Sequence, residues 1–194
     1  MQATIPKALS IEDYLKQEEK ADVKSEYING KIIPMAGGTV NHNQIAVNIT
    51  TELNYAFKKQ DYRVYMGDVR LWIPEKNIFT YPDIMVINGD PIYYENRKDT
   101  ILNPILIIEV LSPSTENYDK EGKFSAYRTI QGFSEYMLLS QTKIYGEKFT
   151  KTDEKTWLFQ EFHQEDQAIQ VQLENISLQF DDIYSSSHTC EIQK

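Results

Sequence analysis

The chain has 194 residues and a net charge of −9, from 29 acidic and 20 basic side chains. Its 41% hydrophobic and 25% charged residues are ordinary for a globular protein and exclude disorder as the main state. No apolar stretch approaches the roughly 18 residues of a membrane span, and no signal peptide is visible. The one cysteine, Cys190, excludes an internal disulfide framework or a cysteine-based zinc cluster, so we expect a cytoplasmic protein. The acidic balance argues against broad coating of duplex nucleic acid, but it is compatible with carboxylates that hold a cation.

The N-terminal part of the chain predicts a helix followed by a tight hairpin. Ser10, with Asp13 three residues later, is a typical helix N-cap and predicts a helix that ends near Lys20. Asn29-Gly30 is the favoured two-residue hairpin turn, because both of its residues adopt positive φ. We therefore expect an antiparallel hairpin of residues 24–28 and 31–35.

A second helix and three short strands should follow. The helix begins at Asn41, and its apolar side chains recur at helical spacing: Ile45, Ile49, Leu53, Ala56 and Phe57. Strands are expected over residues 62–66, 68–73 and 82–88. In the middle strand, alternation predicts that Val69, Leu71 and Ile73 point inward while Asp68, Arg70 and Trp72 point outward.

The second half of the chain begins with a run over residues 104–111 that is apolar except for Glu109, which predicts a strand buried on both faces. A helix is expected from about Tyr118 to Ile130, ended by Gly132, and a strand over residues 135–139. Period-two alternation over residues 143–149, 156–162 and 168–174 indicates antiparallel strands. The fold is therefore α/β or α+β, and no linker divides the chain, so we expect a single domain over residues 1–194.

Glu109 is the most informative polar residue, because apolar residues surround it on the buried strand. An unpaired carboxylate in that place costs several kcal/mol or must stay protonated. It therefore faces a cation or a cleft, reaches solvent at the strand end, or pairs with a base such as Arg70.

Asp83 follows Pro82 at the start of another strand and is also flanked by apolar residues. Carboxylates on neighbouring strands of one sheet can converge, and Mg²⁺ or Mn²⁺ prefers oxygen ligands of this kind. Asp83 alone could be an ordinary turn residue, but together with Glu109 it indicates a divalent cation site.

A lysine follows these acids on the next predicted helix. Asp119, Lys123 and Tyr127 are spaced four residues apart and lie near one helix face. A lysine beside metal-bound carboxylates can position water or stabilise charge on a phosphate, whereas an exposed Asp119–Lys123 pair contributes only about 0.3 kcal/mol. Glu26, on the first hairpin strand, is a further candidate acid. His42, at the start of the second helix, is expected to be structural or solvated.

These residues belong to a series of segments that read SEYING, HNQIAVNI, DVRLWI, YPDIMVI, LIIEVLSPST, DKEGKFSAY and GFSEYMLL. The series resembles the bacterial putative restriction endonuclease family, a branch of the PD-(D/E)XK nuclease superfamily, over roughly residues 8–145. The EVLSPST segment with the downstream D-x-x-x-K-x-x-x-Y motif is specific, whereas the P-D dipeptide alone is weak.

The resemblance implies a restriction-endonuclease-like core of α-β-β-β-α-β order over about residues 8–145, with a β extension over about residues 146–183. It implies an endonuclease that hydrolyses DNA, in which Asp83 and Glu109 hold Mg²⁺, Mn²⁺ can substitute, and Glu26 is a further catalytic acid. The superfamily lysine usually stands two residues after the second acid, where this chain has Leu111. The resemblance is then to the variant with the lysine on the following helix, a place that Lys123 matches and in which Lys120 is its competitor.

Two other functions are compatible with these residues. The missing lysine after Glu109 and the negative charge favour a degenerate nuclease domain that serves in binding or dimerisation. A glycosidase would use Asp83 and Glu109 as acid and base at carboxyl separations of roughly 5 Å or 6.5–9.5 Å, but the chain lacks the clustered aromatic residues of a sugar cleft. Exposed edges in the C-terminal strands make a homodimer an expectation.

Overall fold

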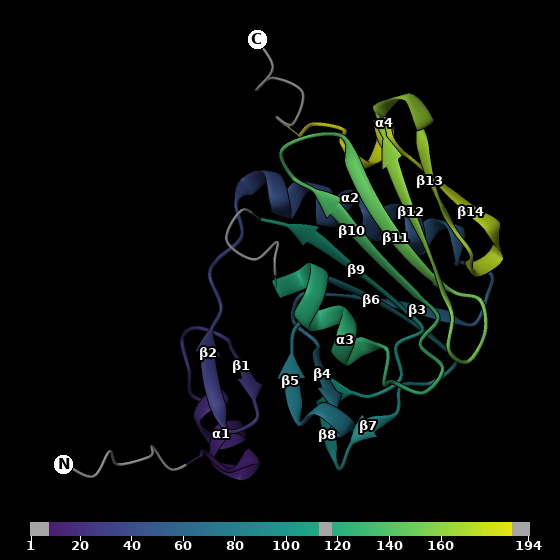
Figure 1. The fold of residues 1–194 in the computed structure, drawn as a ribbon. Coiled ribbons are helices and arrows are strands. Elements are labelled where there is room, and N and C mark those ends of the chain that lie inside the picture. The colour runs from purple at the N-terminus through teal and green to yellow at the C-terminus, as the bar shows by residue number, and fades with distance from the viewer. Residues whose placement is uncertain (1–7, 113–117, 188–194) are drawn as a thin grey trace.

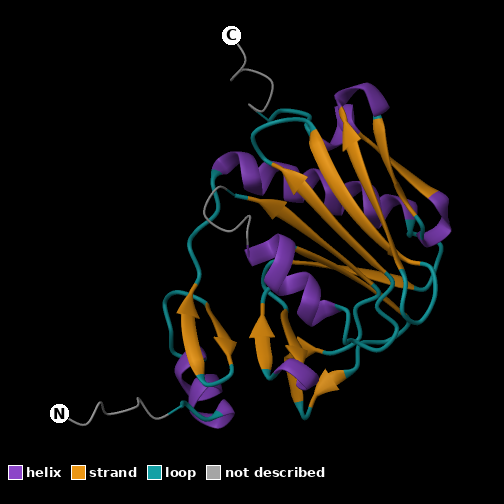
Figure 2. Ribbon diagram, in the orientation of Figure 1, coloured by secondary structure: helices purple, strands orange, loops and turns teal. Residues whose placement is uncertain are grey.

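The computed structural model describes residues 8–112 and 118–187, which form two six-stranded sheets, a two-stranded sheet and several helices (Figures 1 and 2). Sheet A has the strand order β2-β1-β5-β4-β8-β7 and sheet B the order β12-β11-β10-β9-β6-β3. The strands of sheet A are β1 (Ser25–Ile28), β2 (Lys31–Pro34), β4 (Arg70–Ile73), β5 (Ile78–Thr80), β7 (Tyr93–Tyr94) and β8 (Arg97–Ile101). Those of sheet B are β3 (Tyr62–Met66), β6 (Ile84–Asn88), β9 (Leu106–Leu111), β10 (Glu135–Ser140), β11 (Tyr145–Lys151) and β12 (Trp157–His163).

The remaining elements are helices and the small sheet of β13 (Ala168–Val171) and β14 (Ile176–Gln179). The α-helices are α1 (Ile11–Glu18), α2 (Val40–Ala56), α3 (Phe124–Tyr127) and α4 (Phe180–Ile183). Short 3-10 helices are η1 (Pro74–Lys76), η3 (Gln164–Asp166) and η4 (Leu173–Asn175), and η2 (Tyr118–Lys123) is a π-helix. None of the helices in the described part of the chain could cross a membrane. Cys190 and residues 113–115 of the EVLSPST segment lie outside the described residues.

The N-terminal predictions are confirmed. The Ser10 side chain caps α1 by accepting a hydrogen bond from the Asp13 backbone amide at 3.1 Å. β1 and β2 pair antiparallel across Asn29 and Gly30, whose φ angles are 49° and 86°. Gly30 is also needed for space, because a Cβ atom there would lie 2.6 Å from the Ala8 Cβ.

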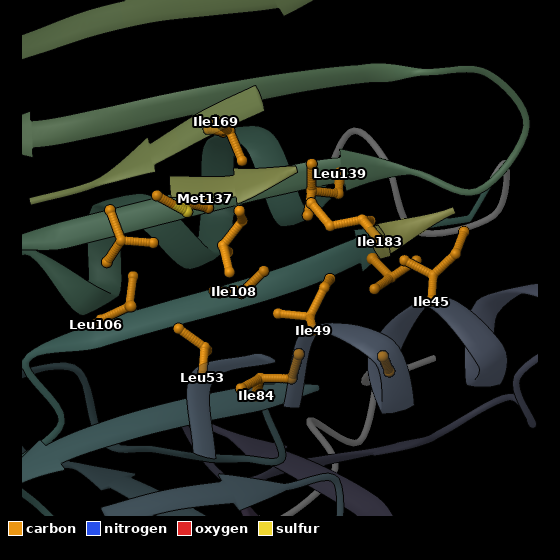
Figure 3. Close-up of a cluster of buried hydrophobic side chains, with 14 of the residues drawn as sticks. Ile45, Ile49, Leu53, Ile84, Leu106, Ile108, Met137, Leu139, Ile169 and Ile183 are labelled. Carbon is orange, nitrogen blue, oxygen red and sulfur yellow. The ribbon is translucent and has the colours of Figure 1, made fainter. Parts of the chain in front are cut away.

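Sheet B carries the main core, and α2 covers one of its faces. The apolar stripe of α2 packs on alternate residues of β6 and β9, as Figure 3 shows for Ile49 beside Ile84 and Ile108. β13, β14 and α4 contribute Ile169, Leu178 and Ile183, respectively, to the same cluster. The long predicted helix and the doubly buried strand are therefore confirmed, since all six residues of β9 are buried.

The opposite face of sheet B is covered by α3, which Figure 1 shows on the other side of the sheet from α2. The alternate residues of β9, Ile107 and Leu111, pack there against Tyr127 of α3. Because side chains alternate along a strand, Glu109 lies between these two on the α3 face. The strand alternation thus decides which helix Glu109 meets.

The side-chain orientation predicted for one strand is wrong. The strand expected over residues 68–73 begins at Arg70 and lies in sheet A. Arg70 and Trp72, expected to point outward, are buried, because α1 covers that face. Trp72 stacks on Phe79 with ring centroids 4.1 Å apart. The core order α2-β3-β6-β9-α3-β10 therefore includes an excursion into sheet A.

Other elements differ from the sequence expectations in part. The helix expected from Tyr118 to Ile130 begins as the π-helix η2, continues as α3 and ends at Tyr127. The turn that follows buries Ile130 and Phe133 in the hydrophobic cluster between α3 and sheet B. Gly132 has a φ of 83° in this turn. β11 and β12 confirm the antiparallel extension of the sheet. Strands β5, β7, β8 and β14 and helix α4 were not predicted.

Candidate active site

The candidate site lies where the chain passes from one sheet to the other. Thr80 ends β5 in sheet A, and Ile84 begins β6 in sheet B, so residues 81–83 form the crossing. Asp83 is the last residue of this crossing. The Thr80 hydroxyl donates a hydrogen bond to Glu26 of β1, which brings a third strand to the same place. Acids from distant parts of the chain therefore meet at the junction of the two sheets.

Each of the carboxylates of Asp83 and Glu109 is held by a backbone amide at the end of the ladder between β6 and β9. The antiparallel ladder between β6 and β9 reaches the pair Ile84–Ile108, and the next residues use side chains in its place. The Asp83 amide donates to Glu109 Oε2 at 3.2 Å, and the Val110 amide donates to Asp83 Oδ2 at 2.8 Å. Each carboxylate thus caps the end of the other strand, which fixes both side chains at the same edge of the sheet.

The second oxygen of Glu109 faces the helix. Lys123 Nζ lies 3.1 Å from Glu109 Oε1, and the Tyr127 hydroxyl donates to the same oxygen at 2.8 Å. Lys123 also lies 2.9 Å from Asp119 Oδ1 and 4.0 Å from Glu26 Oε1. The spacing of four residues predicted from the sequence therefore delivers Asp119, Lys123 and Tyr127 to one site. The Asp119–Lys123 pair is buried rather than exposed.

His42 contacts the carboxylate of Asp83. Its Nε2 lies 3.1 Å from Asp83 Oδ1, so the histidine contacts an acid of the site instead of only solvent. Its backbone amide donates to the Thr39 side chain that caps α2, which fixes the helix start. Gly38 packs against the ring, since a Cβ atom there would lie 3.1 Å from His42 Cδ2. Only the HNQI segment in the family resemblance could have indicated this contact.

Burial dominates the electrostatics of the site. It raises the pKa of Glu109 to about 8; Lys123 opposes this rise, and the carboxylates of Asp83 and Asp119 add to it. Burial lowers the pKa of Lys123, but the carboxylates of Glu109, Asp119 and Glu26 outweigh it and hold that pKa well above its usual value. Lys123 is therefore a permanent cation, whereas the carboxyl group of Glu109 takes up a proton more readily than an ordinary glutamate.

The acids open onto a cleft of about 510 Å³. The acidic and basic side chains that line this cleft are His42, Asp83, Glu109, Asp119 and Lys123. Glu26 is not among the lining residues and contacts the site through Lys123.

Two residues considered from the sequence lie elsewhere. Lys120, the competitor of Lys123, pairs with Glu147 at 2.7 Å. Arg70 is not the partner of Glu109; its Nε donates to the Tyr81 hydroxyl at 2.8 Å. Of the lysines considered, Lys123 is the one that contacts Glu109.

The donor set fits a magnesium ion that takes few protein ligands. Among the residues that the structure describes, no three or more His, Cys, Asp or Glu side chains form a metal-holding group by themselves. Mg²⁺ commonly binds through one or two carboxylates and completes its coordination with water and substrate phosphate. Asp83 and Glu109 would be the two carboxylates, and their positions at one edge of the cleft fit this mode of binding.

Comparison with known proteins places the chain in context. Its sequence matches the Uma2 family, described as "Putative restriction endonuclease", over residues 11–181. Two uncharacterized proteins of Synechocystis sp. are similar to it: sll1609 is 40% identical over 164 residues, covering 84% of this chain and 93% of that protein, and slr1290 is 37% identical over 180 residues, covering 92% and 90%.

A solved structure shares the fold. The crystal structure of a putative nuclease belonging to DUF820 from Anabaena variabilis superposes with a TM-score of 0.74 and 21% identity, covering 91% of this chain and 98% of that one. At this identity the likeness concerns the fold alone. The mixed α+β fold of a nuclease, expected from the sequence, is therefore confirmed.

Proposed function

The chain belongs to the Uma2 family of putative restriction endonucleases, and from this premise we propose that it is a metal-dependent endonuclease that hydrolyses phosphodiester bonds of DNA. The observation that carries the proposal is the interlocked pair of Asp83 and Glu109, beside the ammonium of Lys123, on the floor of a cleft.

The two carboxylates would hold the cation. Asp83 and Glu109 are the candidate ligands for Mg²⁺, and the bound ion would supply Lewis-acid chemistry that favours ionisation of water and withdraws charge from a phosphate. Because each carboxylate accepts a hydrogen bond from the other's strand, their positions are set before any ligand arrives. This preorganisation avoids the cost of ordering two flexible side chains during binding.

The remaining side chains of the site would orient the reactants or hold the candidate ligands in place. Lys123 stays protonated, so it cannot be a general base; its ammonium is suited to orient the attacking water or to stabilise charge that develops on a phosphate oxygen. Tyr127 fixes Glu109 through its hydroxyl, and His42 does the same for Asp83. Glu26 and Asp119 flank Lys123 and hold its ammonium in place.

Cleavage of a labelled DNA with Mg²⁺ or Mn²⁺ tests the proposal. Asp83→Asn and Glu109→Gln should each lower the cleavage rate by about 100-fold or more, because each removes one charged ligand of two. Glu135→Gln, at a second buried glutamate of sheet B, is the matched control and should retain activity. Circular dichroism checks that the variants fold. Full activity of either site variant would exclude that residue from the mechanism.

Metal binding can be measured without turnover. Calorimetric titration of the wild-type chain with Mn²⁺ should give one binding event that Asp83→Asn abolishes. A degenerate domain that only binds or dimerises would give no heat with Mn²⁺ and no cleavage.

A further inference from the structure

Residues 35–39, here named the strap, join β2 to α2 and lie between two clefts that both reach Asp83. One is the site cleft of about 510 Å³, and the second has a volume of about 520 Å³. The two clefts share their lining by Met35, Ala36, Gly37, Gly38, His42 and Asp83. The strap is therefore a wall common to both clefts, and Figure 1 shows it as the connection from the β1–β2 hairpin to α2.

Both ends of the strap are fastened. At its start, the Met35 amide donates to the Lys24 carbonyl oxygen at 2.9 Å. At its end, the Thr39 hydroxyl donates to the side chain of buried Gln141, whose Nε2 in turn donates to the Leu111 carbonyl oxygen at 3.2 Å. The strap is thus tied to the hairpin on one side and to the end of β9 on the other, which restricts its movement away from the clefts.

The acid behind the strap is recessed. Glu109 is 2% exposed and Lys123 is 9% exposed, so a phosphate must enter the cleft to contact them. A duplex is a stiff rod whose two backbones are held apart, whereas a single strand can bend one phosphate inward. The depth of the site therefore favours a flexible strand.

Charge around the clefts gives the same preference. Among the described residues that line them, the basic side chains are Lys24, His42 and Lys123, and the acidic ones are Asp22, Asp68, Asp83, Glu109 and Asp119. Lys24 contacts Asp68, and Lys123 lies among carboxylates. Duplex DNA carries one negative charge per about 1.7 Å, about twice the density of one strand, so walls with this charge balance disfavour the duplex more strongly.

Apolar side chains stand where a base could rest. Val23 and Met66 line the second cleft, which Asp83 also lines, and are 57% and 39% exposed. The faces of stacked bases are hidden inside a duplex, whereas an unpaired strand presents them to apolar side chains.

We propose that the strap restricts the site to one flexible nucleic acid strand, so that single-stranded DNA, or a single-stranded region of a longer DNA, is the preferred substrate. This inference rests on the proposed nuclease function for its chemistry. Its basis in the molecule is the fastened strap, the recessed Glu109 and the exposed Val23 and Met66.

The test compares one strand with its own duplex. The wild-type chain with Mn²⁺ is given a labelled DNA of about 30 nucleotides without self-complementarity, alone or annealed to its complement. The single strand should be cut at least about 10-fold faster, and equal or faster cutting of the duplex would overturn the inference. If neither DNA is cut, the proposed function fails, and fluorescence anisotropy of the same two DNAs then decides. At least about 5-fold tighter binding of the single strand supports the inference, and equal or tighter binding of the duplex overturns it.

A longer strap gives the second test. An insertion of about four glycines between Gly37 and Gly38 should relax the constraint and lower the preference for the single strand by about 5-fold. The same insertion between Glu154 and Lys155, in the exposed turn between β11 and β12, is the control and should leave the preference unchanged. A folded strap variant with unchanged preference, in rate or in anisotropy, would show that the strap is not the determinant.

Discussion

Two glutamates of sheet B are equally buried and have different surroundings. Glu109 stands near the end of β9, and Glu135 begins the neighbouring parallel strand β10, so they lie at opposite ends of one strand pair. Both oxygens of Glu135 accept hydrogen bonds from the Gln172 amide at 3.0 Å, and Lys148 lies 3.9 Å away. Glu109 has as its neighbours a second acid, Asp83, and a cleft.

The comparison shows that burial of an acid does not define an active site. Burial raises the pKa of Glu135 to about 7, as it raises that of Glu109 to about 8. Glu135 is satisfied by the backbone of the C-terminal extension, and it lines neither of the two clefts beside the strap. It fastens the extension to the sheet, whereas Glu109 is placed to accept a further positive charge. The following experiments separate these two roles.

Substitution of the lysines beside the two glutamates should give the largest difference in cleavage rate. Lys123→Met removes the ammonium 3.1 Å from Glu109 and leaves three carboxylates without it, so cleavage should fall by about 100- to 1000-fold. Lys148→Met, beside Glu135, and Lys120→Met, beside Glu147, should stay within about threefold of wild type. Initial rates on a labelled DNA measure this difference. A loss in Lys120→Met as large as that in Lys123→Met would reassign the catalytic lysine.

Truncation of Glu135 should act on stability instead. Glu135→Ala leaves the Gln172 amide and the Lys148 ammonium without their buried partner, which should lower the free energy of unfolding by about 3 kcal/mol. The cleavage rate of the protein that remains folded should be unchanged. Urea denaturation measures the stability, with Glu165→Ala, at an exposed acid, as the control. A stable but inactive Glu135→Ala protein would contradict the division of roles.

Stability should fall as the pH rises. The folded-state pKa values of Glu109 and Glu135, about 8 and about 7, lie above the usual 4.5, so between these values the folded chain binds more protons than the unfolded chain. The contribution of these protons to the free energy of unfolding is complete below pH 4.5 and is lost as the pH rises through each folded-state pKa. Between pH 6 and 8, the free energy of unfolding of the metal-free protein should fall by about 2 kcal/mol because of Glu109. Glu109→Gln, or added Mn²⁺, should remove that part of the loss and leave the part due to Glu135. Denaturation at several pH values checks this, and an unchanged slope in Glu109→Gln would contradict it.

The smallest effect concerns the tyrosine that holds Glu109. Tyr127→Phe removes a hydroxyl 2.8 Å from Glu109 Oε1, which should lower the cleavage rate by about fivefold, or about 1 kcal/mol. Tyr184→Phe is the matched control, because this tyrosine is also buried and its hydroxyl donates to the Ser140 carbonyl oxygen, while its side chain does not line the site cleft. Equal rates for the two variants would show that Tyr127 has no positioning role.

Local patterns predicted much of the fold. Three local patterns predicted their structures correctly: the Asn29-Gly30 turn, the apolar stripe of α2 and the apolar run of β9. They succeed because turn geometry and side-chain periodicity depend on neighbours in sequence. The family and its fold also followed from the order of the motifs.

Only the tertiary structure shows which sheet each strand joins and which distant residues are in contact. The alternation of β4 gave no sign that it joins sheet A or that a second layer buries Arg70 and Trp72. The contact between His42 and Asp83 joins residues that are far apart in the chain.

The sequence by itself determined which residues are acidic, which strand buries Glu109 and which helix face carries Lys123. Only the packing of the two sheets decided that Asp83 and Glu109 interlock at their junction while Glu135 is enclosed by the C-terminal extension. The physical reason is that the charge state and role of a buried carboxylate depend on the groups within a few ångströms of it, and chain folding brings those groups from distant positions.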